Sequence, residues 1–77
     1  MAITIHFFGS LVDITGQSKK ELNILRDTDS LNLQLQKEYP ALISTKYFIA
    51  VNQQMIKINR ELNNGDIVAL MPPFSGG

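Results

Sequence analysis

The sequence contains no cysteine, no tryptophan and a single histidine. Without cysteine the chain can form neither a disulfide bond nor a thiolate nucleophile, and it cannot supply the sulfur ligands of a zinc finger. The histidine, His6, has no second ligand type at a metal-binding spacing, so we expect no metal site and a solvent-facing strand position for it. The lack of cysteine suits a reducing, cytoplasmic location.

An excess of either charge is also missing, because seven acidic residues balance seven Lys plus Arg. A neutral chain has no positive field that attracts phosphates, which makes nucleic acid a poor candidate partner. No window approaches the length and hydropathy of a membrane span. Residues 1–8 alternate polar with apolar and lack the basic start and apolar run of a signal peptide, so we expect no membrane partner.

The chain has 77 residues, of which 44% are hydrophobic. This length allows one small domain, which buries only about 60% of its unfolded surface and therefore has a thin margin of stability. We find no repeat, linker or low-complexity segment. The size argues against an enzyme with several sites of its own.

Residues 3–7 alternate in the period of a half-buried strand whose odd-numbered side chains face the core. Gly9 and Ser10 end this strand. Residues 11–16 are too few for a long helix, and we expect a single turn or loop in which Gly16 supplies backbone freedom.

Residues 21–25 alternate again, which predicts a hairpin partner for the first strand. Leu22 and Ile24 should point inward. The solvated edge of this hairpin is expected at Lys19, Lys20 and Glu21.

The middle of the chain fits two interpretations. Residues 31–36 alternate like a strand, while Leu31, Leu35 and Tyr39 also share one face of a helix. We favour the helix, because Leu, Gln, Lys and Glu are good helix formers and a strand would prefer β-branched residues.

The ends of this helix carry their own signals. Asp29 or Ser30 can cap the exposed N–H groups, and Pro40 makes Tyr39 a natural end. Asp27 and Asp29 flank the expected helix start, where acidic side chains interact favourably with the helix dipole. We therefore interpret the two aspartates as capping residues rather than as a catalytic pair.

The second half of the chain reads as strands and turns. In chain order, we expect a central strand at 47–51, a turn at 52–54, a short strand at 55–58, a turn at 64–65 and a last strand at 66–71 that ends before Pro72. A hairpin, a helix and further strands predict an α+β domain with one main helix packed on one face of a mixed sheet.

The closing segment is PPFSGG at 72–77. At average residue frequencies, two glycines that close a chain just after Pro-Pro arise by chance roughly once in 10⁵ sequences, although a frayed terminus is the ordinary alternative. Fully extended, the segment spans roughly 20 Å, and the two prolines stiffen its base. We expect a tail that threads into another protein, formed by Pro72, Pro73, Phe74, Ser75, Gly76 and Gly77.

The last two residues lack Cβ atoms, so they could pass a channel too narrow for other residues and present the α-carboxylate of Gly77. A carboxylate is a poor electrophile until its oxygen becomes a good leaving group, so an ATP-dependent partner would have to convert it to an acyl-adenylate. Gly9 and Gly16 have neither the spacing nor the lysine of a phosphate loop, so this chain has no motif for that step.

Four segments together resemble the MoaD/ThiS sulfur-carrier family of ubiquitin-like β-grasp domains. They are FFGSL at 7–11, AVN at 50–52, LNNGD at 62–66 and PPFSGG at 72–77. The resemblance covers nearly every residue and implies one β-grasp domain over residues 1–77, with 72–77 as an extended tail. The alternating stretch at 31–36 departs from the family, which has a more regular amphipathic helix there.

The resemblance implies a reaction sequence at Gly77. An E1-like, MoeB-like adenylyltransferase would use ATP to adenylate Gly77, and a sulfur donor would turn its carboxylate into a thiocarboxylate. The sulfur would then pass to cyclic pyranopterin monophosphate inside the MoaE-like large subunit of molybdopterin synthase, and two transfers would make the dithiolene of the molybdenum cofactor. The chain would bind no cofactor and would not be an enzyme by itself.

A docking surface can be expected from alternation. If Val68 and Leu70 face inward with Ile49 and Val51, their neighbours face outward beside the tail. We predict a partner interface at Phe48, Ala50, Ala69 and Met71. The alternative is that helix and loops cover these residues as ordinary core.

Three other functions stay open. A thiazole-synthesis carrier of the same family would share the terminal chemistry, although 7–9 and 72–74 favour the molybdopterin branch. A ubiquitin-like modifier would join Gly77 to a target lysine, but such tails are usually basic and this one is not. A plain adaptor would tolerate deletion of Gly76 and Gly77.

Overall fold

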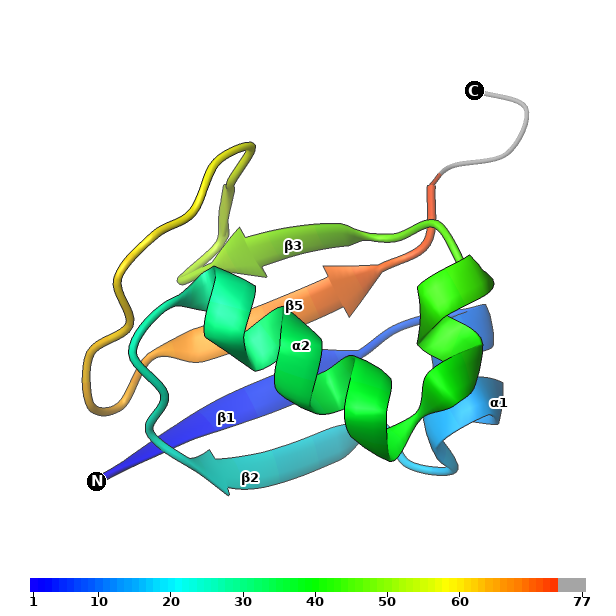
Figure 1. Cartoon of the computed structure of the whole chain (residues 1–77), viewed down its shortest axis with the longest axis horizontal. Coiled ribbons are helices and arrows are strands. Elements are labelled where there is room, and N and C mark those ends of the chain that lie inside the picture. Colours follow the sequence, from blue (N-terminus) through cyan, green and yellow to red (C-terminus); the bar gives the residue numbers. More distant parts are fainter. Residues whose placement is uncertain (74–77) are drawn as a thin grey trace.

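The structure is a computed structural model that describes residues 1–73. A five-stranded mixed sheet in the order β2-β1-β5-β3-β4 carries the helix α2 across one face (Figure 1). The elements are β1 (Ala2–Phe7), α1 (Ser10–Thr15), β2 (Lys19–Asn23), α2 (Thr28–Glu38), the 3-10 helix η1 (Pro40–Ser44), β3 (Phe48–Val51), β4 (Gln54–Met55) and β5 (Ile67–Met71). The predicted α+β class, with one main helix on a mixed sheet, is confirmed. Within residues 1–73, no helix has the length and apolar character needed to cross a membrane.

The first hairpin forms as alternation predicts. The three odd-numbered apolar side chains of β1 are buried, and β1 pairs with β2 antiparallel in a register that places Ile3 opposite Leu22. The strand β2 starts at Lys19, two residues before the predicted start at 21, because the backbones of Lys19 and Lys20 pair with β1 whatever their charge. Leu22 and Ile24 both pack against the core, as expected.

Residues 10–15 form a short helix, α1, rather than the expected turn or loop. Its anchor is Leu11, which is completely buried and ties the segment to the core. Gly16 ends the helix with φ of +77° and donates its N–H to the carbonyl of Val12 at 2.7 Å. The backbone freedom predicted for Gly16 is therefore confirmed, and the element before it is more regular than predicted.

The helical interpretation of the middle segment is confirmed. Leu31 and Leu35 are 0% exposed whereas Leu33 is 63% exposed, and a strand would have placed all three on one face.

The N-cap of α2 is Asp27, not Asp29 or Ser30, because the Asp27 carboxylate accepts the Ser30 N–H at 2.9 Å. The hydrogen bond from the Ser30 backbone, followed by the one from the Asn59 side chain, holds the pKa of the Asp27 carboxyl below its ordinary value. The predicted C-terminal end at Tyr39 is confirmed.

The segment after α2 departs from the prediction in two places. Pro40 opens a 3-10 helix whose Leu42 is buried, an element that the apolar pattern did not indicate. In place of the short strand expected at 55–58, the strand β4 consists only of Gln54 and Met55, and Ile58 is 82% exposed.

The physical reason is the turn at Asn52 and Gln53, where φ is +49° and +71°. This turn pairs Gln54 with Val51 at once, after which the chain leaves the sheet toward the start of α2. There the Thr28 N–H donates to the carbonyl of Arg60 at 2.9 Å.

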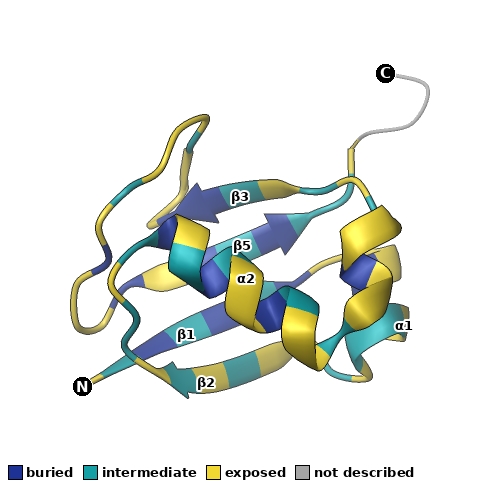
Figure 2. Ribbon diagram, viewed as in Figure 1, coloured by how far each residue is buried: buried dark blue, intermediate teal, exposed yellow. Residues whose placement is uncertain are grey.

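The core lies between α2 and the covered face of the sheet (Figure 2). The strand β5 occupies the middle of the sheet, parallel to β1 and antiparallel to β3, so the predicted central strand at 47–51 is an interior strand beside the true centre. Val68 and Leu70 are fully buried there. Among the described residues, every buried side-chain nitrogen and oxygen atom has a hydrogen-bond partner.

Candidate functional site

The base of the tail lies at the centre of the sheet, where β5 ends. The chain leaves β5 at the end of the sheet that also holds α1 and η1 (Figure 1). Phe8, the residue after β1, donates its N–H to the carbonyl of Leu70 at 3.1 Å. This hydrogen bond joins the end of β1 to β5 two residues before Pro72. Pro72 is half-buried and Pro73 is exposed. The predicted threading residues 74–76 and the predicted reactive Gly77 lie outside the described residues.

The four predicted interface residues are brought together by the pairing of β3 with β5. Phe48 pairs with Met71 and Ala50 with Ala69, on the face away from α2. Phe48 is 45% exposed, and Ala69 and Met71 are half-buried. Ala50 is only 4% exposed, so its expected contribution to an accessible patch is wrong: the short methyl group lies between the larger Met55 and the paired strand.

Sequence reasoning missed three further apolar residues on this face. Ile67 precedes Ala69 and Met71 by the strand period and is 49% exposed. Met55, paired with Ala50, is 55% exposed. Phe8 is 48% exposed, and its ring stacks on His6 at a centroid distance of 6.3 Å. The same alternation that predicted Met71 was sufficient to find Ile67.

We call this surface the open face. It consists of Phe8, Phe48, Met55, Ile67, Ala69 and Met71. His6 pairs with Ala69 across the β1–β5 ladder and borders the face, half-buried, at a strand position. Apolar side chains exposed together on one face of a sheet are typical of a protein–protein contact.

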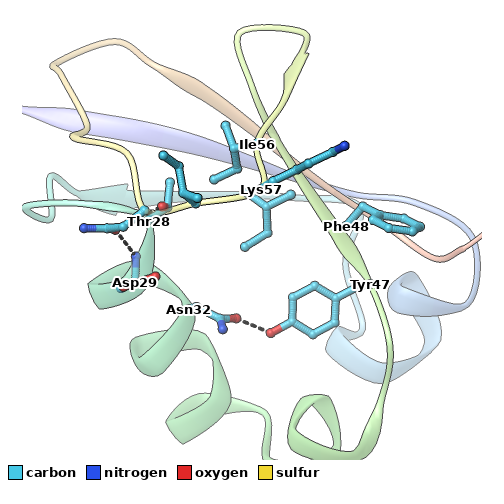
Figure 3. Close-up of a pocket in the computed structure, with 10 residues that line it drawn as sticks. Thr28, Asp29, Asn32, Tyr47, Phe48, Ile56 and Lys57 are labelled. Carbon is cyan, nitrogen blue, oxygen red and sulfur yellow. Dashed lines mark hydrogen bonds between the residues drawn. The ribbon is translucent and has the colours of Figure 1, made fainter.

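A groove of about 490 Å³ lies between the start of α2, β3 and the loop 56–59, with Phe48 of the open face among its lining residues (Figure 3). Its polar side chains are already engaged: the Tyr47 hydroxyl donates to Asn32 Oδ1, and Asn59 Oδ1 accepts the Asp29 N–H at 2.9 Å. The floor is apolar, and the charged groups are Asp29 and Lys57. This set contains no paired acid and base, and across residues 1–73 no three potential metal ligands gather.

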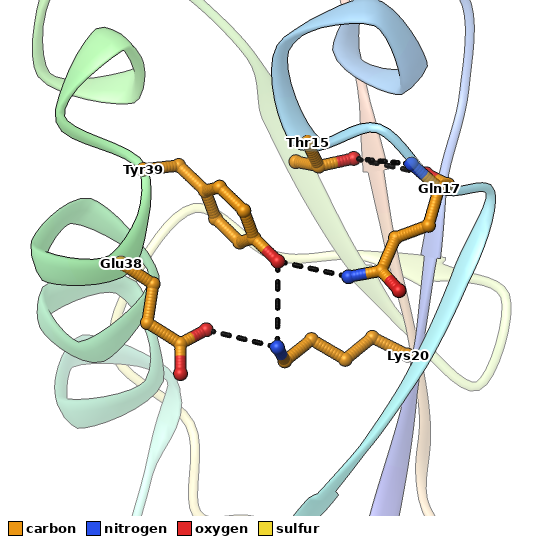
Figure 4. A network of polar contacts seen from close by, with 5 residues as sticks. All are labelled: Thr15, Gln17, Lys20, Glu38 and Tyr39. Carbon is orange, nitrogen blue, oxygen red and sulfur yellow. Dashed lines mark hydrogen bonds and ion pairs between the residues drawn. The ribbon is translucent and has the colours of Figure 1, made fainter.

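A polar cluster ties the C-terminal end of α2 to β2 (Figure 4). Lys20 Nζ lies 3.2 Å from Glu38 Oε2 and donates to the Tyr39 hydroxyl at 3.3 Å, while Gln17 Nε2 donates to the same hydroxyl at 2.8 Å. The hydrogen bond to Glu38, followed by the one to Tyr39, raises the pKa of Lys20 above its usual value. The cluster joins the end of α2 to β2 and to the connection before β2, and its polar groups bind one another, so we interpret its role as structural.

The start of β5 is held by a second cluster. Asp66 accepts the Asn63 N–H at 2.8 Å and the Asn52 side-chain amide at 2.9 Å. The Asn63 hydrogen bond, and then that of Asn52, lowers the pKa of the Asp66 carboxyl below its ordinary value. The ionised Asp66 carboxylate therefore holds the start of β5, the strand that precedes residues 72–77.

Comparison with known proteins agrees with this geometry. The family model described as "ThiS family" matches residues 5–77. A curated relative, the molybdopterin synthase sulfur carrier subunit of Mycobacterium tuberculosis, is 31% identical over an alignment that covers 97% of this chain and 96% of the relative.

Solved structures show the same ubiquitin-like β-grasp fold. One is the protein–protein complex of subunits 1 and 2 of the molybdopterin-converting factor from Helicobacter pylori, with 26% identity, a TM-score of 0.75 and full coverage of both chains. Another is small archaeal modifier protein 1 from Methanosarcina acetivorans, with 21% identity, a TM-score of 0.83, and coverage of 99% of this chain and 96% of that one. The resemblance inferred from the four sequence segments is confirmed, and the chain belongs to the ThiS family.

Proposed function

We propose that this chain is the sulfur-carrier small subunit of a molybdopterin synthase. The observation that carries the proposal is the family match, which runs from residue 5 to residue 77 and so includes the closing Gly76 and Gly77. The relative that bears this function in its name aligns with this chain over nearly the whole length of both. The fold supports the proposal, because β5 ends at the sheet centre and directs the chain outward next to an apolar face.

The chemistry would take place at the carboxylate of Gly77. An E1-like adenylyltransferase would join that carboxylate to AMP from ATP, with release of pyrophosphate, which makes AMP the leaving group. A sulfur donor would then attack the carbonyl carbon and expel AMP. Hydrogen sulfide would give the thiocarboxylate directly, whereas a persulfide donor would give an acyl disulfide that a thiol reductant cleaves to the thiocarboxylate. The thiocarboxylate sulfur would form a bond to cyclic pyranopterin monophosphate in the large subunit, and water would then cleave the bond between the Gly77 carbonyl carbon and that sulfur, which returns the carrier as a carboxylate.

In this scheme the chain itself performs no bond-making step. The described residues contain no cluster of metal ligands; in the two polar clusters Lys20 is ion-paired with Glu38, and Asp66 accepts hydrogen bonds from Asn63 and Asn52. The partners would supply ATP binding, the sulfur source and the pterin site. The carrier would contribute a recognisable surface and a terminus that reaches the reactive centre.

We place the large-subunit contact on the open face. Phe48 and Met71 lie opposite each other on β3 and β5, directly before the tail, so a partner that covers them also receives residues 72–77. Apolar side chains at the centre of an interface carry most of its binding free energy. The Helicobacter pylori structure contains both subunits of its converting factor, which supports a complex of this type.

The direct test is intact mass after incubation with ATP, an E1-like adenylyltransferase and a sulfur source. Replacement of one terminal oxygen atom by sulfur is the expected product. A matched chain that lacks Gly77 should keep its mass, since its terminus would be Gly76 one residue short of the reactive centre. An unchanged mass for the full chain, with an enzyme shown to be active on another carrier, would contradict the proposal.

A second candidate is a ubiquitin-like modifier, favoured by the structural likeness to small archaeal modifier protein 1. The same adenylate would then be attacked by a lysine amine and form an isopeptide bond. The mass experiment separates the two functions when a lysine-bearing target protein is added to the mixture, because a modifier then gains the mass of that target. A thiazole-synthesis carrier would give the same thiocarboxylate but fail to deliver sulfur to the pterin in the large subunit.

A further inference from the structure

The backbone of Gly9 lies against the ring of Pro72, at the point where the chain leaves β5. A Cβ atom built on Gly9 would be 2.9 Å from Pro72 Cγ and 3.5 Å from Pro72 Cδ. The first distance is too short for two carbon atoms, whose favourable separation is about 3.5–4.0 Å. Only glycine leaves room for the proline ring at this place.

The backbone around Gly9 and the end of β5 are both held in place. Leu11, next in α1, is completely buried and donates its N–H to the carbonyl of Phe8 at 3.1 Å. Val12 donates its N–H to the carbonyl of Gly9, also at 3.1 Å. Across the sheet, Phe8 is hydrogen-bonded to Leu70, two residues before Pro72. The position of Gly9 relative to β5 is therefore set by the core and by the sheet ladder.

The other glycines with positive φ provide a comparison. Gly16 and Gly65 have φ of +77° and +86°, and a Cβ on either would meet no atom within 4 Å. At these two positions glycine satisfies the backbone alone. At Gly9, where φ is +56°, it satisfies the backbone and also the space next to Pro72.

We propose that Gly9 is a positioning residue for the tail: by lacking a side chain it seats the Pro72 ring and so sets the direction in which the chain leaves the sheet. This inference rests on the proposed sulfur-carrier function, in which the terminus must reach a partner's reactive centre. A shift of about 1 Å at such a centre can reduce a rate about a hundredfold. Gly9 acts through Pro72 and touches no reacting atom.

The test compares Gly9→Ala with Gly16→Ala in thiocarboxylate formation, after circular dichroism has shown that both variants are folded. Gly9→Ala should lower kcat roughly tenfold or more at unchanged KM, because the folded domain that the enzyme binds is intact while the tail is misdirected. Gly16→Ala, which strains the backbone but meets no neighbour, should retain the kcat of the unaltered chain. Equal kcat values for the two variants would overturn the inference.

Because alanine also strains the backbone at Gly9, a double-mutant cycle isolates the collision. Pro72→Ala removes both ring atoms that the new Cβ would approach, whereas the backbone strain of Gly9→Ala stays the same. Gly9→Ala should therefore reduce kcat by a smaller factor in the Pro72→Ala background than in the unaltered chain. The same factor in both backgrounds would overturn the inference.

A measurement without any partner separates this inference from the proposed function. In the unaltered chain, nuclear Overhauser effects should connect the α protons of Gly9 with the ring protons of Pro72, and this holds whether or not Gly77 accepts sulfur. Absence of these nuclear Overhauser effects would refute the contact between Gly9 and the Pro72 ring and would leave the proposed carrier function unaffected. If Gly9→Ala fails to fold, Pro72→Ala alone tests the inference. A lowered kcat at unchanged KM would support positioning of the tail through Pro72, and an unaltered kcat would refute it.

Discussion

The two faces of the sheet are made by the same strands and differ in what covers them. On the covered face β5 presents Val68 and Leu70, both 0% exposed beneath α2. On the open face the same strand presents Ile67, which is 49% exposed, together with Ala69 and Met71. Because neighbouring residues of a strand point to opposite sides, each strand can supply folding free energy with one set of side chains and a partner surface with the other.

The largest expected effect belongs to the covered face. Leu35→Ala should lower the free energy of unfolding by about 2–5 kcal/mol, because it leaves a cavity in a fully packed core. Leu33→Ala removes the same atoms from the same helix at a position that is 63% exposed, and it should change stability by less than about 0.5 kcal/mol. Urea denaturation of both variants measures the difference, and similar losses would contradict the division between covered and exposed positions.

The open face should show the reverse behaviour. Met71→Glu places a charge within the proposed interface and should weaken large-subunit binding by about 2 kcal/mol or more, with little change in the free energy of unfolding. The control is Leu33→Glu, which adds the same charge on the exposed side of α2 and should leave binding unchanged. Titration calorimetry gives both affinities.

Met71→Glu would defeat the proposed interface if the variant folded and still bound the large subunit with unaltered affinity. Binding lost to an equal extent in the Leu33→Glu control would also contradict it, because the effect would then come from charge in general and not from the open face.

The third prediction concerns the anchor that places β5. The folded state lowers the pKa of Asp66 below the ordinary 3.8, so its stabilisation is fully present above that pH and is lost as the pH falls through the lower folded value. Asp66→Asn should destabilise the protein by about 1–3 kcal/mol at neutral pH, since one buried acceptor is lost. It should also reduce the dependence of stability on pH below 4, as measured by urea denaturation at a series of pH values.

The exposed Asp13 supplies the control for this prediction. Asp13→Asn should leave both the stability and its acid dependence close to those of the unaltered chain. An Asp66→Asn variant with the full acid dependence would show that Asp66 is not the titrating anchor.

The smallest effect is expected at the cluster between β2 and α2. Tyr39→Phe removes the hydroxyl that accepts from Gln17 and Lys20, and it should cost about 1 kcal/mol of stability. The pKa of Lys20 is raised in the folded state. The stabilisation that Lys20 contributes is therefore present at pH values below its ordinary pKa of 10.5 and is lost as the pH rises through its folded-state pKa. Tyr39→Phe should lower the Lys20 pKa, which an NMR titration measures; an unchanged pKa would contradict the contact.

The sequence was sufficient for the features that depend on local periodicity. Alternation identified β1, a continuous apolar run before Pro72 identified β5, and alternation within the strands gave the outward direction of Phe48 and Met71. Helix propensity decided correctly against the strand-like alternation at 31–36, as the exposure of Leu33 shows. These features are local because strand and helix periods are repeated within a few residues.

Features that depend on contacts between distant segments were not predictable from the pattern. The hydrogen bond from Asn59 Nδ2 to the Asp27 carboxylate, at 3.1 Å, joins the cap of α2 to a segment far along the chain. The buried state of Ala50 depends on its neighbours on β4 and β5. Gly9 was part of a recognised segment, but its contact with Pro72 requires the parallel pairing of β1 with β5 to be known.

The most direct test of the central claim is a single turnover with purified, thiocarboxylated chain, the large subunit and cyclic pyranopterin monophosphate. We predict that the carrier returns with an oxygen in place of its sulfur, that the pterin acquires a dithiolene, and that two carriers are consumed for each dithiolene formed. A chain lengthened beyond Gly77 should carry no sulfur at all. Dithiolene formed with that lengthened chain, in the absence of proteolytic trimming, would contradict the claim that the carboxylate of Gly77 carries the sulfur.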